Sequence, residues 1–164
     1  VTSTSGRPAT PPLALISETP VVAAFVTVRT LTATAAPTPT VPGVTALPSA
    51  TALPSLFAEA ARAMNSLAGT VTGKSPRLKR TFESEAPDAE SLLVAFLSEL
   101  VYYQEQENLA FDVFELRIEA QRLNVEMEGA QIASIDKAIK AVTYHNMKIE
   151  ETSRGIEVVI VFDV

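Results

Sequence analysis

The chain has 164 residues, 47% of them apolar, and a formal net charge of −6, which suits one domain with a filled core. It has no cysteine and one histidine, so disulfides, thiolate metal sites and histidine-rich metal sites are excluded. The acidic balance argues against unaided nucleic-acid binding, because neutralising phosphates requires clustered lysine and arginine. The apolar stretch at residues 20–28 is too short to span a bilayer and lacks the basic start of a secretory signal, so we expect a cytoplasmic protein.

The composition changes near Leu53. Residues 1–52 contain eight of the eleven prolines, twelve threonines and only three charged side chains. Because proline removes backbone donors and favours extended chain, we expect 1–52 to be a disordered Thr/Pro/Ala-rich segment and 53–164 to be the folded domain. Two other interpretations stay open. One is that Val21–Leu31, which is β-branched and free of proline, forms a strand at a sheet edge. The other is that a shifted reading frame contributes the whole Thr/Pro/Ala-rich segment, since the chain begins with Val.

Two amphipathic helices are predicted in the folded part. The first enters at Thr51 and Ser55 and ends near Gly69, with apolar residues at helical spacing: Leu56, Phe57, Ala60, Ala61, Met64 and Leu67. The second begins after Pro87 with Asp88 as the N-cap residue. Its apolar face consists of Leu92, Leu93, Phe96, Leu97, Leu100 and Tyr103.

Alternation of apolar and polar residues predicts strands that bury one face. These strands are Lys79–Glu85, Phe114–Ile118, Leu123–Met127, Lys140–Glu150 and Ile156–Asp163. The second and third form one predicted hairpin, and the fourth and fifth form another around Ser153-Arg154-Gly155. Together the elements indicate an α+β, two-layer domain whose mixed, mostly antiparallel sheet carries both helices on one face.

An acidic residue lies at the tip of the last apolar strand, in Phe162-Asp163-Val164. A carboxylate there has no evident packing role, and hard divalent cations prefer oxygen ligands. Asp163 and the terminal carboxylate of Val164 are therefore candidate ligands of a calcium-like ion. The competing interpretation is an exposed end residue, because such cations usually take six or more oxygens.

The block Lys140-Ala-Val-Thr-Tyr-His145 is the second candidate. On a strand Lys140 and Tyr144 lie on one side, whereas Thr143 and His145 lie on the other. A single histidine on an apolar strand face is more typical of a packed core residue than of a catalyst, and no Ser-His-Asp or Cys-His pattern accompanies it.

The loop Lys74–Arg80 carries four basic residues in seven. Such a run contacts RNA or an acidic protein surface in some proteins and is simply solvated in most. No glycine-rich phosphate loop is present in the sequence, so nucleotide binding through a known fingerprint is not supported.

These blocks resemble the archease family. The resemblance covers Leu53 to Val164 and rests on four motifs: Leu56–Ala61, Ser91–Leu100, Lys140–His145 and Val161–Val164. It implies a non-enzymatic protein cofactor of an RtcB-type RNA ligase, which promotes guanylylation of the ligase from GTP and its repeated turnover in tRNA splicing and RNA repair. RNA would be contacted only through the ligase, and no membrane is involved.

The resemblance also implies specific site residues. It implies a divalent metal ion bound by an N-terminal Asp together with Asp163 and Val164, and a functional lysine at Lys140. Partner contacts would continue through Thr143, Tyr144 and His145. In the family the N-terminal Asp stands in a His-Thr-Ala-Asp strand some ten residues before the first helix. The corresponding stretch here, residues 40–45, contains neither His nor Asp, so one implied ligand is missing.

Two function classes compete with this interpretation. One is a metal-dependent phosphoester hydrolase that uses Asp163 and His145, against which the shortage of ligands and nucleophiles argues. The other is a plain protein-interaction module with the Thr/Pro-rich segment as a linker or binding arm.

Overall fold

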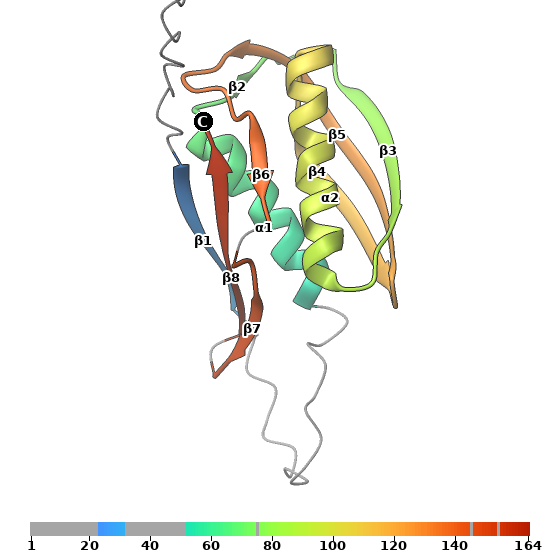
Figure 1. Ribbon diagram of the computed structural model, residues 1–164. Helices are drawn as coiled ribbons and strands as arrows, with labels where there is room; N and C mark the ends of the chain where they lie inside the picture. Colours follow the sequence, from blue (N-terminus) through green and yellow to red (C-terminus); the bar gives the residue numbers. More distant parts are fainter. Residues whose placement is uncertain (1–22, 32–51, 75, 145, 154) are drawn as a thin grey trace, which may run out of the picture.

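The computed structural model describes residues 23–31, 52–74, 76–144, 146–153 and 155–164. Figure 1 shows two antiparallel β-sheets with the two α-helices between them. The expected α+β class with mostly antiparallel pairing is confirmed, but in the described residues the helices lie between two four-stranded sheets instead of on one face of a single mixed sheet. No helix in these ranges has the length and apolar run needed to cross a membrane.

The first sheet is built around β8 (Gly155–Asp163). On one side β8 pairs over its full length with β1 (Ala23–Leu31), and on the other side with β6 (Ala141–Thr143) and β7 (Ile149–Thr152). Every second residue of β8 from Ile156 to Phe162 is buried. The alternation therefore gives this sheet an inner face toward the helices and an outer face toward solvent.

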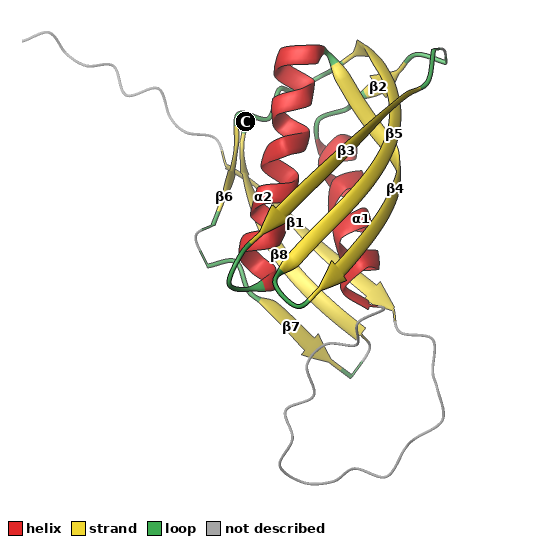
Figure 2. Cartoon of the chain, turned by 90° about the vertical axis from the view of Figure 1, so that its right-hand side faces the viewer, coloured by secondary structure: helices red, strands yellow, loops and turns green. Residues whose placement is uncertain are grey.

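The second sheet is built around β5 (Arg122–Ser134). β4 (Leu109–Glu119) and β3 (Leu78–Glu85) flank β5, and the short β2 (Val71–Thr72) pairs with its end. Its outer face is polar, as the alternation predicted, and Figure 2 shows that face toward the viewer with the helices behind it.

Helices α1 (Ala52–Leu67) and α2 (Ala89–Tyr102) fill the space between the sheets. α1 contacts β1, β4 and β8, and α2 contacts β3 and β6, so each helix touches both sheets. The predicted apolar faces are buried except for Leu67, which is partly buried against the core, and Phe57 and Phe96 are stacked at 6.2 Å between ring centroids. α2 begins after the N-cap Asp88, as predicted, and continues into a π-helical turn, η1 (Tyr103–Glu107).

The edge strand that the sequence left as an alternative within Val21–Leu31 is formed as β1. Val28 enters the core, and Val26 packs against it. The side-chain hydroxyl of Thr30 is buried and has no hydrogen-bond partner among the described residues. Residues 1–22 and 32–51, the rest of the Thr/Pro-rich segment, lie outside the described residues.

The prediction of a single strand over Lys140–Glu150 is wrong. The chain forms β6, leaves the sheet, and returns as β7. Thr143 at the end of β6 pairs with Val161, and Ile149 at the start of β7 pairs with Val158, so the pairing register changes between the two short strands. Asn146 has a left-handed φ of 57° and Met147 is buried, so the intervening segment turns instead of extending.

Candidate functional site

β6 brings the lysine-led block against the end of β8. The backbone N–H of Lys140 donates to the carbonyl oxygen of Asp163 at 2.8 Å. The Lys140 ammonium donates to a main-chain oxygen of Val164 at 3.2 Å, and the Cα atoms of Ala141 and Asp163 are paired across the strands. The structure thus places three of the predicted site residues together at one corner of the first sheet.

Asp163 lies on the outer face of this sheet. Its neighbour Phe162 is fully buried on the inner face, so strand alternation directs Asp163 outward with Val161 and Val159. The residues paired with Asp163 on the two flanking strands are Ala23 and Ala141. The Asp163 carboxylate is therefore the one ionisable side chain in its row across the described sheet.

The described residues do not fit the divalent cation that the resemblance implies. No second carboxylate accompanies Asp163 on the paired positions, and the Val164 oxygen already accepts from the Lys140 ammonium. A cation at that oxygen would meet a like charge instead of the oxygen cage that calcium requires. Throughout the described ranges, no group of three or more histidine, cysteine or acidic side chains is arranged to hold a metal ion. The acidic residue nearest before β1, Glu18, lies outside them.

The remainder of the predicted block reaches the start of α2. Thr143 pairs with Val161 and is half-buried on the outer face. The Tyr144 hydroxyl lies 3.4 Å from both the Asp88 carboxylate and the Ser91 hydroxyl. His145 lies outside the described residues, so the prediction that it faces a partner stays a prediction.

The N-cap and first turn of α2 contact the chain at Tyr144 and again at Ile149, a relationship that the sequence analysis missed. Tyr144 meets the N-cap Asp88, and the N–H of Ile149 donates to Glu90 at 3.0 Å. Hydrogen bonds from the Ser91 hydroxyl and the Ser91 N–H, the latter at 2.7 Å, lower the pKa of Asp88. The capping signal of Asp88 was visible in the sequence, but its proximity to Tyr144 depends on packing between β6 and α2.

Comparison with known proteins decides the family. The model of the Archease protein family matches residues 47–164, well over half of the chain. The chain belongs to the archease family. Protein archease from Pyrococcus furiosus is 33% identical over 107 residues, which cover 60% of this chain and 75% of that protein. Protein archease from Methanosarcina barkeri is 33% identical over 119 residues, covering 66% and 81% respectively.

A solved structure supports the fold. The solution structure of Methanobacterium thermoautotrophicum protein 1598 superimposes with a TM-score of 0.51 at 21% identity, covering 68% of this chain and 85% of that one. The archease match begins at residue 47, so β1 precedes the matched residues. β1 nevertheless pairs with β8 at all nine of its positions and completes the sheet that carries Asp163.

The basic run of this archease is paired with acids. Arg77 bonds Asp112 at 2.5 Å and Glu128 at 3.0 Å, and Arg80 bonds Glu107 at 2.7 Å. The hydrogen bond from Arg77 lowers the pKa of Asp112. These guanidinium groups are committed to carboxylates, which favours the interpretation of a solvated structural loop over an RNA contact.

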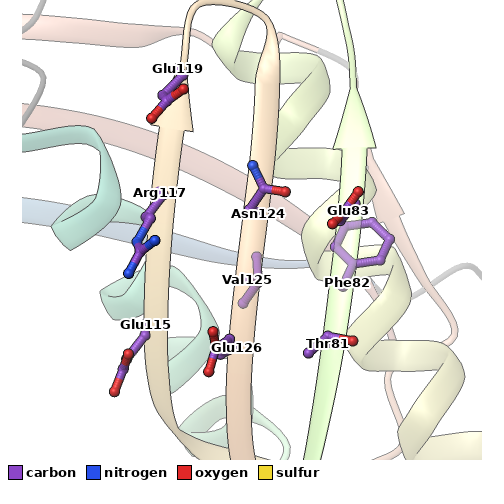
Figure 3. A pocket seen from close by; sticks show the side chains of 9 residues that line it. All are labelled: Thr81, Phe82, Glu83, Glu115, Arg117, Glu119, Asn124, Val125 and Glu126. Atoms are coloured by element: carbon purple, nitrogen blue, oxygen red, sulfur yellow. The ribbon is translucent and has the colours of Figure 1, made fainter.

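A shallow depression lies on the outer face of the second sheet, across β3, β4 and β5 (Figure 3). Glu115 and Glu126 are directly opposite each other on neighbouring strands, and Arg117 faces Asn124. Figure 3 shows the glutamates spread along the strands instead of converging on one point. Like charges placed in this way disfavour an anionic ligand and offer no focused site.

Proposed function

We propose that this archease activates an RtcB-type RNA ligase, promoting its metal-dependent guanylylation and multiple turnover in tRNA splicing and RNA repair. In this proposal the chain is a protein cofactor, catalyses no reaction itself, contacts RNA only through the ligase and works in the cytoplasm. The observation that carries the proposal is the junction of Lys140, Asp163 and Val164 at one exposed corner of the first sheet.

The corner presents two opposite charges, the Lys140 ammonium and the Asp163 carboxylate, which point in different directions. The Lys140 side chain is exposed, and its contact with a main-chain oxygen of Val164 uses one of the three donors of the ammonium, so a phosphate or carboxylate of a partner can bind the others. Asp163 projects from the outer face beside small alanine side chains, which leave room for a partner to approach. Guanylylation depends on positioning and charge stabilisation, and a docked protein can supply both to the ligase.

The proposal does not require a metal ion held by this chain. The described neighbours of Asp163 do not complete a metal site, so any effect on the ligase would come from the lysine and the carboxylate themselves. The same neighbours give no support to a phosphoester hydrolase, because Asp163 meets two alanines across the strands instead of a base or nucleophile.

The test measures transfer of labelled GMP from GTP to the purified cognate ligase. We expect the wild-type chain to raise the initial rate, and both Lys140→Ala and Asp163→Ala to abolish the increase. Lys79→Ala is the matched control, because Lys79 is an exposed lysine on the other sheet with one weak contact to Glu128 at 3.9 Å. A folded wild-type chain that leaves the rate unchanged would refute the proposed function.

A further inference from the structure

The outer face of the first sheet is apolar around Asp163. Three strands contribute six residues to this surface, which we call the open face: Ala23, Phe25, Thr27, Thr143, Val159 and Val161. Phe25 is 70% exposed and Val159 is 45% exposed. Phe25 is paired with Val161, so Val159 is its diagonal neighbour and within reach of the phenyl ring.

No described element covers the open face. The residues of β1 and β8 that alternate with it, such as Val28 and Ile160, are buried on the inner side against the helices. Figure 1 shows both helices on that inner side of β1, β8 and β6. A large aromatic side chain on an uncovered sheet face, beside a charged corner, is typical of a surface that binds another protein.

We infer that the open face is the surface on which the RNA ligase docks, with an apolar ligase surface against Phe25 and Val159 and a basic group facing Asp163. This inference rests on the proposed function. It adds that β1, which precedes the matched family residues, supplies part of the partner contact.

The charges around the open face favour a basic protein surface as the partner. At one end of the open face lies the Asp163 carboxylate, and at the other end Arg29 and Glu157 form an ion pair at 2.7 Å that cancels their charges. The chain as a whole has a net charge of −6, so nucleic acid is repelled and a basic protein surface is attracted. A second copy would bring the same negative charge toward the face.

The area of the open face favours a transient complex over a permanent one. The three strands lie about 4.8 Å apart, and about six residues of each, at a rise of about 3.3 Å per residue, border the open face. The open face therefore has an area of roughly 300 Å². A stable interface usually buries about 800 Å² on each partner. The open face alone is therefore too small for a permanent dimer of this chain, but it suits a transient complex in which the Lys140–Asp163 corner provides further contacts.

The test replaces the two exposed apolar side chains by threonine, which keeps the preference for strand structure, in the double variant Phe25→Thr/Val159→Thr. We measure the dissociation constant of the full chain for the purified cognate ligase by fluorescence titration. We expect binding to weaken at least tenfold, with guanylylation restored at saturating concentrations of the variant. Val113→Thr is the matched control, because Val113 is 49% exposed on the outer face of the other sheet, and it should bind as the wild type does.

Thr27→Lys provides an independent variant at an exposed position of the open face, should the double variant not fold. Thr27 pairs with Val159, so a lysine there would place a charge against the apolar ligase surface and weaken binding. Wild-type affinity in folded double and lysine variants would overturn the docking inference while leaving the proposed function intact. Equal weakening by Val113→Thr would also overturn it, as would a wild-type dimer in sedimentation that the double variant dissociates. If the wild-type chain neither binds nor activates the ligase, the proposed function is refuted, and the docking inference, which rests on it, is refuted as well.

Discussion

The backbone amide of Lys140 donates to the carbonyl oxygen of Asp163 at 2.8 Å, where β6 begins and β8 ends. This bond joins main-chain atoms, so strand pairing fixes the backbone of Lys140 whatever side chain stands there. Function and stability at this position are therefore separable.

Lys140→Met should leave the fold intact and remove activation. The side chain is exposed, and substitutions at such positions usually change the free energy of unfolding by less than about 0.5 kcal/mol. Urea unfolding followed by circular dichroism should give a near wild-type midpoint, whereas ligase guanylylation should lose its stimulation. A loss of about 2 kcal/mol or more would show that the lysine is a structural residue instead.

Gly129→Ala should destabilise the protein. A Cβ atom at Gly129 would stand 2.0 Å from the carbonyl oxygen of Ala110, next to the irregular pairing between Phe111 and Val113. Because the contact is with backbone, β4 must shift, and we expect a cost of about 2–3 kcal/mol in chemical denaturation. Gly73→Ala is the control, since its nearest atom is the Gln131 carbonyl oxygen at an ordinary 3.5 Å. Equal stability of the two variants would contradict the expected clash.

Thr30→Val should stabilise the protein. Within the part of the chain that the structure describes, the Thr30 hydroxyl is buried without a hydrogen-bond partner, and valine has the same shape without the polar atom. Removing an unsatisfied polar group should raise the free energy of unfolding by about 1 kcal/mol. Thr27→Val, at an exposed position on the opposite face of β1, should change it much less. A destabilised Thr30→Val would mean that the hydroxyl has a partner after all.

The contribution of Asp88 to stability should depend on pH. Its pKa is lowered below the ordinary value of 3.8 by hydrogen bonds from Ser91, so the folded protein favours the carboxylate. That contribution is present above pH 3.8 and is lost as the pH falls through the lower pKa of the folded state. The difference in melting temperature between the wild type and Asp88→Asn, which keeps the cap but not the charge, should shrink in acid. A difference that is constant from pH 7 to pH 3 would rule out this linkage.

Much of the fold could be predicted from local patterns. The helical spacing of residues such as Phe57 and Phe96 and the N-cap at Asp88 act over a few neighbours, and both helices form as expected. The β4–β5 hairpin likewise follows from alternation on either side of a short turn. The strand in 21–31 remained one of three interpretations, because its formation depends on pairing with β8 at the other end of the chain.

The sequence by itself determined the helices, the alternating strands and the membership of the archease family, since these depend on residues close together in the chain or on motifs read in order. Only the tertiary structure decided that residues 140–150 split into β6 and β7, that Tyr144 meets Asp88, and that Phe25 is exposed beside Val161 and Asp163. The physical reason is that strand pairing and helix–sheet packing join distant residues through backbone hydrogen bonds and apolar burial, and no local period specifies which distant partner is chosen.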